Sequence, residues 1–217
     1  VTACAGRGPR RAARARSWRA LLPASTMSSS SEAASGTNGK ASASASASHR
    51  GQGAIMLMKE LKGLKKSPVE GFSAGLRDES NPFIWDICIM GPPDSPYDGG
   101  YFNATMEFPL TYPNQPPKLV INSEFYHPNV YPDGARKGEV CISILHQPGE
   151  DQYGYELASE RWLPIHSVES ILVSVISMLS APNNDSPANV EAAKMMREDP
   201  DKYRKACARV VRLSVDG

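Results

Sequence analysis

The chain has 217 residues, of which 41% are apolar, enough for one domain of ordinary size with a packed core plus shorter extra segments. Its formal net charge of +1 hides an uneven distribution, because residues 1–50 hold eight of the 24 basic and one of the 23 acidic side chains, which leaves 16 basic and 22 acidic residues in 51–217. This acidic region lacks a basic stripe, which argues against nucleic-acid binding, and no apolar run reaches the ~18 residues of a transmembrane helix.

Residues 1–26 contain six arginines and no acid, a composition typical of organelle transit peptides. Because Met27 opens the next segment, translated upstream sequence or residues added during expression are the favoured interpretation. Residues 27–53 are mostly Ser, Ala and Gly and cannot bury enough surface to offset their ordering entropy. We therefore expect residues 1–53 to be a disordered tail, Arg-rich and then Ser/Ala/Gly-rich, before a catalytic domain over residues 54–217.

Leucines at helical spacing predict a first short helix from residue 54, since Leu57, Leu61 and Leu64 recur along one face before "SPVEG". The segment "PFIWDICIM" predicts a strand, and "GPPDSPYDGG" predicts a turn-rich connection. In "YFNATMEF" the alternation predicts a half-buried antiparallel strand whose buried face carries Phe102, Ala104, Met106 and Phe108. "KLVIN" predicts a further strand after the proline-broken "FPLTYPNQPP".

Three helical patterns follow in the last third of the chain. "SVESILVSVISMLS" carries a broad apolar stripe with Glu169 in its first turn, and "SPANVEAAKMMRED" opens with a Ser-Pro start signal. "DPDKYRKACARVVRLS" places Tyr203, Cys207 and Val210 on one face. A helix, then strands, then helices is an α+β order.

The four cysteines differ in their surroundings. Cys4 lies in the tail, Cys88 in an apolar strand and Cys207 on an apolar helical stripe, so we expect all three to be inert. No pair has C-x-x-C spacing and the histidines complete no zinc site, so we expect unpaired thiols in a reducing compartment and no bound metal. Cys141 follows a Pro-, Gly- and Asp-rich loop, and the local pattern leaves open whether it is a nucleophile or a buried core thiol.

Several motifs in order decide between these alternatives. They are "HPN" at 127–129, "VCISIL" at 140–145, "RWLPIHSVESIL" at 161–172 and "APNNDSPAN" at 181–189. Together with "GPPDSPYDGG" and "FPLTYPNQPPK" upstream, they resemble a ubiquitin-conjugating enzyme over about residues 54–217. The acidic "HQPGEDQYGYELASERW" is most similar to the G-type members. The resemblance implies an N-terminal helix, a four-stranded antiparallel sheet and C-terminal helices.

The resemblance also implies the chemistry. Cys141 would accept ubiquitin as a thioester from an activating enzyme and pass it to a lysine amine, usually with a ligase, because a thiol is both a good nucleophile and a good leaving group. Asn129 would stabilise negative charge on the thioester carbonyl oxygen, or hold its loop by hydrogen bonds, and both roles stay open. His127 is expected to be structural and Pro128 to fix the backbone.

The incoming lysine must lose a proton near pH 7 although its free pKa is about 10.4. The family pattern puts Ser186 at the gate of the site, with Asp185 beside it, and we expect Tyr131 to lie against the lysine as well. An alternative role for Ser186 is that of a helix N-cap before Pro187.

The resemblance implies two further surfaces. A ligase, most simply of the RING type, would contact the first helix and two loops through Asn114, Pro164 and Ile165, and Asn114 stands where the family often has a larger apolar residue. The acidic residues after the cysteine are either a solvated loop or, as we expect, a device that positions ubiquitin or its lysine; they are Glu150, Asp151, Glu156 and Glu160.

We expect no bound cofactor, because ATP is consumed by the upstream activating enzyme, and a role in protein degradation. We expect a cytoplasmic location, extending to the nucleus or the cytosolic face of the endoplasmic reticulum. Two alternatives are conjugation of another ubiquitin-like protein and a non-catalytic ubiquitin-binding variant, although retention of Cys141 argues against the second.

One spacing departs from the family. Asn129 and Cys141 are twelve positions apart, whereas about eight is usual, as the resemblance implies. The extra residues are most easily placed at 135–138, in a surface hairpin whose tip points away from the nucleophile, because lengthening a loop costs only about 0.6 kcal/mol per doubling.

Overall fold

The computed structural model describes residues 40–151, 154 and 156–216, with side chains from residue 51 onward. The expected disorder of residues 1–39 therefore lies outside the described residues. Within the described part of the chain, no helix is both long enough and apolar enough to cross a membrane.

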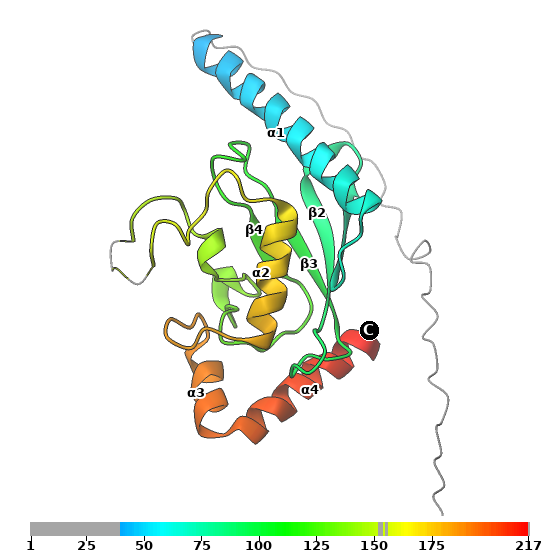
Figure 1. The fold of residues 1–217 in the computed structure, drawn as a ribbon, viewed down its shortest axis with the longest axis vertical. Coiled ribbons are helices and arrows are strands. Elements are labelled where there is room, and N and C mark those ends of the chain that lie inside the picture. The colour runs from blue at the N-terminus through cyan, green and yellow to red at the C-terminus, as the bar shows by residue number, and fades with distance from the viewer. Residues whose placement is uncertain (1–39, 152–153, 155, 217) are drawn as a thin grey trace, which may run out of the picture. The chain divides into compact units, whose positions relative to one another are not determined.

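The fold consists of one antiparallel sheet with helices before and after it (Figure 1). The sheet has the strand order β1-β2-β3-β4. Two single 3₁₀ turns, Gly134–Arg136 and Ser143–Leu145, lie between the last strand and the second helix. The elements are α1 Lys40–Lys66, β1 Phe72–Asp78, β2 Asn81–Met90, β3 Tyr101–Glu107, β4 Lys118–Ile121, α2 Val168–Ser180, α3 Val190–Glu198 and α4 Pro200–Asp216. The predicted α+β fold is confirmed.

The alternating apolar residues of β3 lie on its buried face, as the sequence predicts. Phe102, Ala104 and Met106 are at most 2% exposed, and they pair with the buried residues Ile89, Ile87 and Trp85 of β2. Side chains that stand opposite each other on one face of an antiparallel pair pack directly against each other. This pairing builds the apolar face of the sheet on which α2 lies.

Helix α2 covers the sheet in Figure 1 with the apolar stripe read from its sequence. Its start is set by Ser167, which forms a capping box with Ser170 and so satisfies N–H groups that have no partner within the helix. The buried stripe consists of Val168, Ile171, Leu172, Val175, Met178 and Leu179. Each fully buried side chain of this size contributes about 1.5–3 kcal/mol, so the stripe anchors the helix to the sheet.

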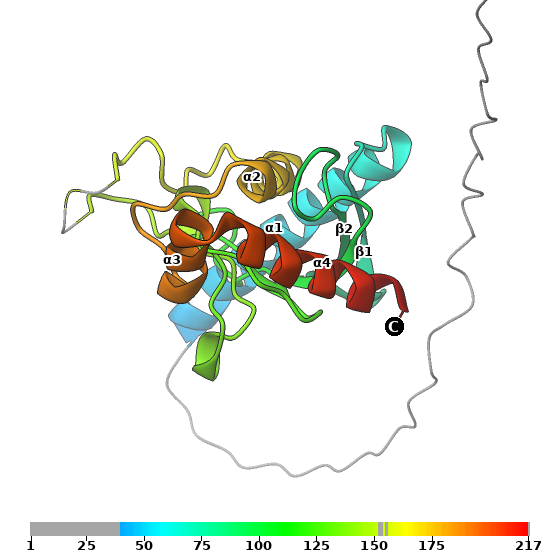
Figure 2. The same cartoon turned by 90° about the horizontal axis from the view of Figure 1, so that it is seen from below.

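Helix α4 closes one end of the molecule, running on from α3 across the end of the sheet as Figure 2 shows from below. Tyr203, Cys207 and Val210 are its buried residues, as the sequence predicts. The N–H of Tyr101, at the start of β3, donates to the hydroxyl of Ser214 at 3.0 Å. The last helix is thereby joined to the sheet by both packing and a hydrogen bond.

Two predicted helix starts are wrong. Helix α1 begins at Lys40 rather than near residue 54, so part of the expected tail is helical. Residues 41–48 alternate Ser with Ala, the best helix former, and extending an existing helix avoids the cost of nucleation. Helix α3 begins at Val190 rather than at the Ser-Pro pair, because the side chain of Asn189 accepts a hydrogen bond from the N–H of Ala192 at 3.0 Å.

A carboxylate on α1 joins three parts of the fold. Glu60 accepts a hydrogen bond from the Tyr112 hydroxyl at 3.0 Å and another from the N–H of Val168 at 2.7 Å. Val168 is the first residue of α2, where backbone N–H groups lack intrahelical partners and negative charge is favourable. Glu60 therefore ties α1 to the proline-rich loop and to the start of the helix that covers the sheet.

We expect Glu60→Ala to lower the free energy of unfolding by about 1–3 kcal/mol, because the first N–H of α2 and the Tyr112 hydroxyl lose a charged acceptor. Urea unfolding followed by circular dichroism measures the change. Lys59→Ala removes an exposed side chain from the same helix and should change stability by less than ~0.5 kcal/mol. Equal losses in the two variants would contradict the role of Glu60 as a link.

Candidate active site

Cys141 lies directly after a short paired segment. Val130 and Val140 form an isolated antiparallel bridge, and the N–H of Cys141 donates to the carbonyl oxygen of Asn129 at 2.9 Å. Beyond the cysteine, the 3₁₀ turn Ser143–Leu145 bends the chain back on itself. The half-buried thiol is thus held between the "HPN" segment on one side and a tight turn on the other.

His127 is a fully buried part of the framework. Its Nδ1 accepts from the N–H of Asn129 at 2.8 Å, so Nε2 carries the hydrogen and donates to the carbonyl oxygen of Met178 at 3.1 Å. Burial lowers the pKa of His127 to about 4, against the opposing effect of the bond to Met178. The neutral imidazole, hydrogen-bonded at both ring nitrogens, fastens the loop to the end of α2. The N–H of Asn189 adds a hydrogen bond to the carbonyl oxygen of Pro128 at 2.8 Å.

Asn129 makes a reciprocal pair with the segment after α2. Its Nδ2 donates to the carbonyl oxygen of Asn183 at 2.8 Å, and its Oδ1 accepts from the N–H of Asn183 at 2.9 Å. Asn129 is 2% exposed, so this pair is sheltered from water. The geometry supports the loop-holding role, and because an amide carries two hydrogens, the pair uses only one of its N–H groups.

A histidine and a carboxylate stand behind the cysteine in line. His146 Nε2 lies 3.3 Å from Cys141 Sγ, and His146 Nδ1 lies 2.8 Å from an oxygen of Glu156. The other oxygen of Glu156 accepts from the hydroxyl of Ser143 at 2.8 Å. Sequence reasoning did not single out His146, whose only signal is its position five residues after the cysteine. The 3₁₀ turn between them brings the two side chains together.

The electrostatics of this group distinguish Cys141 from the other cysteines that the structure describes. Burial raises the pKa of its thiol, but the hydrogen bond and positive charge of His146, the Tyr131 hydroxyl and the charge of Arg136 together outweigh burial, and the net effect is a lowered pKa. The bond to Cys141 is the main cause that raises the pKa of His146 to about 9, and Glu156 adds to it. Burial raises the pKa of Cys88 and of Cys207. Of these three free thiols, Cys141 is the one whose surroundings lower its pKa and so favour the thiolate.

Of three other predicted site residues, the structure places one beside Cys141 and two on the segment that holds Asn129. The hydroxyl of Tyr131 lies 3.9 Å from Cys141 Sγ. Asp185 and Ser186 are exposed and follow closely on Asn183, the backbone partner of Asn129, and the N–H of Asp185 bonds the side chain of Asn183 at 2.9 Å. The alternative N-cap role of Ser186 is wrong, because Asn189 caps α3.

Comparison with known proteins agrees with this geometry. The family model described as "Ubiquitin-conjugating enzyme" matches residues 56–211. The chain belongs to the ubiquitin-conjugating enzyme family.

Relatives support the same assignment. Ubiquitin-conjugating enzyme E2 14 of Arabidopsis thaliana is 60% identical over 163 residues, which are 75% of this chain and 95% of that protein. Ubiquitin-conjugating enzyme E2 G2 of Homo sapiens is 50% identical over 159 residues, 73% of this chain and 94% of that protein. The solved structure of human ubiquitin-conjugating enzyme E2 G1 is 49% identical with a TM-score of 0.51, covering 60% of this chain and 96% of that one. The predicted family, its G-type likeness and the prediction of a transferase are confirmed.

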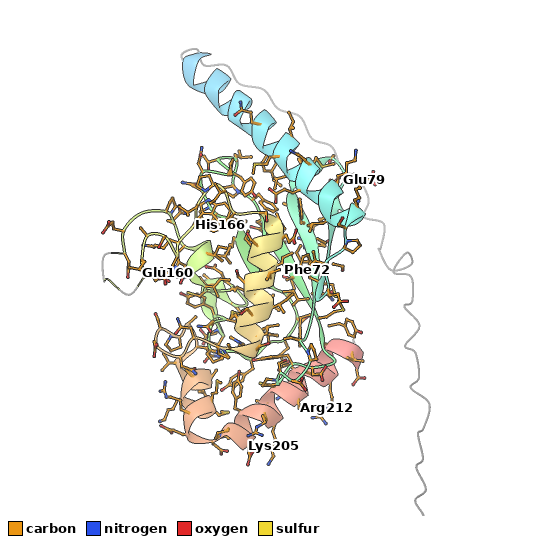
Figure 3. The ribbon with its side chains drawn as sticks, viewed as in Figure 1. Phe72, Glu79, Glu160, His166, Lys205 and Arg212 are labelled. Carbon is orange, nitrogen blue, oxygen red and sulfur yellow. The ribbon has the colours of Figure 1, made fainter. Side chains whose placement is uncertain are left out.

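Within this member of the ubiquitin-conjugating enzyme family, the acidic loop contributes unequally to the site. Glu156 lies behind His146 and also faces Arg161 at 3.5 Å. Glu150 is exposed, as is Glu160, which accepts from the N–H of Leu157 and lies on the projecting loop in Figure 3; Asp151 is half-buried. Among residues 40–151, 154 and 156–216, no group of three His, Cys, Asp or Glu side chains is arranged to hold a metal ion.

The two loops expected to meet a ligase are held together. The indole N–H of Trp162 donates to the carbonyl oxygen of Pro113 at 2.7 Å, which joins the "WLPIH" loop to the proline-rich loop. Asn114 and Pro164 are both exposed, and Ile165 is 85% exposed. An isoleucine this exposed presents its apolar surface to solvent at the junction of the two loops.

The extra residues 135–138 form the turn of a hairpin, as predicted. The N–H of Gly138 donates to the carbonyl oxygen of Tyr131 at 2.8 Å, and the N–H of Tyr131 donates to the carbonyl oxygen of Glu139 at 3.0 Å. The expectation that the tip points away from the nucleophile is wrong for one side chain, because Arg136 folds back and donates to the Tyr131 hydroxyl at 2.6 Å. In this position the guanidinium makes both this hydrogen bond and a cation–π contact with the Tyr131 ring.

We expect His146→Gln to move the pH dependence of Cys141 alkylation to higher pH. With the imidazolium beside it, the thiol ionises below its usual pKa; removing that cation raises the pKa, so less thiolate is present near neutral pH. Rates of iodoacetamide labelling of the Cys141 peptide, followed by mass spectrometry across pH, measure the effect. His166→Gln, another half-buried histidine, should leave the profile where it is. Coincident profiles for parent and His146→Gln would contradict the assigned pairing.

Proposed function

We propose that Cys141 accepts ubiquitin from an activating enzyme as a thioester and that the chain then transfers it to a lysine amine. The observation that carries this proposal is the Cys141 thiol aligned with His146 and Glu156, in a chain of this family. In charging, the Cys141 thiolate attacks the carbonyl carbon of the activated ubiquitin C-terminus, and the activating enzyme's thiolate leaves. In discharge, the lysine nitrogen attacks the new thioester, the C–S bond breaks with its electrons on Sγ, and the nitrogen loses a proton.

His146 has a different task in each step. Before charging, its positive charge stabilises the thiolate. Thioester formation removes that thiolate, and with it the main cause of the raised pKa of His146, so the imidazole can become neutral. A neutral imidazole held by Glu156 is then placed to accept the proton that the lysine loses. Tyr131, Ser186 and Asp185 are proposed to flank that lysine.

The remaining N–H of the Asn129 amide can donate to the oxygen that becomes negative when the thioester carbonyl is attacked. Charging moves an acyl group from one sulfur to another, and discharge moves it from sulfur to nitrogen. Neither transfer needs a cofactor, because ATP is consumed upstream. Free thiols suit a reducing compartment, so we place the activity in the cytoplasm, in the nucleus or at the cytosolic face of the endoplasmic reticulum, in protein degradation.

We also propose that the joined loops carrying Asn114, Pro164 and Ile165 dock a ligase of the RING type, together with α1. Ile55 and Met58 on α1 are 74% and 45% exposed, so apolar side chains are available on the helix as well as on the loops. A central apolar anchor surrounded by polar residues is the usual composition of an interface centre, and Ile165 suits that role.

The ligase proposal predicts that Ile165→Ala leaves charging intact and lowers RING-stimulated discharge by about fivefold or more, since loss of an interface anchor costs more than ~1 kcal/mol. A panel of RING domains is screened on the parent, and discharge to free lysine is then measured with those that stimulate it. Leu213→Ala truncates an exposed side chain on α4 and should behave as the parent. Unchanged stimulation of the Ile165 variant would remove this surface from consideration.

The central experiment is incubation with activating enzyme, ATP and ubiquitin on a non-reducing gel. We expect a reducible adduct on the parent and a stable, non-reducible oxyester on Cys141→Ser, because an alkoxide leaves less readily than a thiolate. Cys88→Ser and Cys207→Ser should charge normally. If the parent charges only with another modifier in a panel of ubiquitin-like proteins, the substrate assignment changes; if it charges with none, the chain is a non-catalytic binder and the proposal fails.

A further inference from the structure

The hairpin of residues 135–138 brings a cation into contact with the site. Arg136 is the last residue of the 3₁₀ turn Gly134–Arg136. Family members with the shorter, usual spacing lack these extra positions. The side chain of Arg136 is half exposed, yet its guanidinium is held by two residues, Glu139 and Tyr131.

The base of the hairpin is rigid, so the position of Arg136 is well defined. Gly138 has φ +78°, and a Cβ there would stand 2.2 Å from the carbonyl oxygen of Ile121, so only glycine fits. The N–H of Ile121 donates to the carbonyl of Gly138 at 2.8 Å, which fastens the hairpin to the end of β4. Glu139 accepts from Arg136 Nε at 2.7 Å and pairs with Lys118 at 3.0 Å.

Arg136 contacts Tyr131 in two ways. One guanidinium nitrogen donates to the Tyr131 hydroxyl oxygen at 2.6 Å, and the guanidinium carbon lies 3.8 Å from the centre of the ring. The hydroxyl in turn points to Cys141 Sγ at 3.9 Å. Because guanidinium can only donate, the phenol oxygen must accept from it and its own hydrogen is directed elsewhere. The sulfur is the acceptor the structure offers for that hydrogen.

The hydrogen bond from Arg136 to the Tyr131 hydroxyl also strengthens the bond that this hydroxyl donates to the sulfur. A hydroxyl whose oxygen accepts from a cation becomes a stronger donor, since hydrogen bonds in series reinforce each other. Tyr131 and His146 face Cys141 directly, and Arg136 and Glu156 stand behind these two. Glu139 pairs with Arg136, and Lys118 pairs with Glu139.

We propose that Arg136 is a positioning residue for discharge, holding the Tyr131 hydroxyl so that it donates to Sγ as the Cys141 thiolate leaves. When the lysine nitrogen attacks, the isopeptide bond forms, the C–S bond breaks and its electron pair remains on sulfur, where the Tyr131 O–H stabilises it without transferring its proton. Donors aimed at charge that appears in the transition state accelerate a reaction more than donors that bind the ground state. This inference rests on the thioester chemistry proposed above.

The matched test compares Arg136→Ala with Lys137→Ala, which removes the same charge from the same turn and has an exposed side chain. We expect single-turnover discharge of the ubiquitin thioester to free lysine to slow about fivefold in Arg136→Ala and to stay within about twofold of the parent in Lys137→Ala. Equal rates for the two variants, at low and at physiological salt, would overturn the inference.

A double-mutant cycle separates positioning from a general charge effect. Tyr131→Phe removes the hydroxyl that Arg136 holds, so in that background Arg136→Ala should cause no further slowing. If the two losses multiply, Arg136 acts independently of Tyr131 and the proposed route is wrong. If Tyr131→Phe alone discharges at the parental rate, the hydroxyl has no role and the inference fails as well.

An assay without ubiquitin keeps the result independent of the proposed function. Arg136→Ala should move the pH dependence of iodoacetamide labelling at Cys141 to higher pH than Lys137→Ala does, because both the Tyr131 hydrogen bond and the charge of Arg136 favour the thiolate. A parent that never charges defeats the proposed function, whereas the labelling comparison still decides whether Arg136 acts on the sulfur. Coincident labelling profiles for the two variants would exclude that action.

Discussion

The reciprocal pair between the Asn129 amide and the backbone of Asn183 is the constraint on which the site depends. It joins the segment before Cys141 to the segment after α2, and the residues beside Asn129 add further hydrogen bonds. The His127 ring bonds a carbonyl oxygen at the end of α2. The carbonyl oxygen of Pro128 accepts from the N–H of Asn189, the residue before α3, and the carbonyl oxygen of Asn129 accepts from the N–H of Cys141. A thiol on a loop is thereby tied through hydrogen bonds to the end of α2 and to the start of α3.

The side chains that lower the pKa of the Cys141 thiol or support those that do come from both sides of it in the sequence. Tyr131 precedes it, His146 follows it across one 3₁₀ turn, and Glu156 belongs to the acidic loop beyond. The half-buried position would by itself disfavour a thiolate, so the site uses nearby donors and a cation to reverse the effect of burial. The same low exposure strengthens those interactions, because little water competes for them.

Local periodicity predicted the elements whose burial is regular, and it failed where partners are distant. The apolar stripe of α2 and the alternation of β3 each identify an element within its own residues, whereas β1, "FSAGLRD", has neither pattern and is a strand only because β2 pairs with it. The motifs singled out Cys141 and Asn129. They did not single out His146, which reaches Cys141 only through a turn and pairs with a carboxylate ten residues later. They also misplaced the start of α3, which Asn189 caps instead of Ser186.

The hairpin before the cysteine also bears on how such a chain can change length during evolution. Gly134 and Gly138 both adopt positive φ, and the bonds between Tyr131 and the 138–139 segment close the hairpin beneath its turn. Residues gained or lost above that closure leave the register below it unchanged, so Cys141 keeps its place while the sequence of the turn varies. The position is therefore a permissive site for insertion close to Cys141, where new side chains can reach the neighbours of the thiol without a change in the rest of the fold.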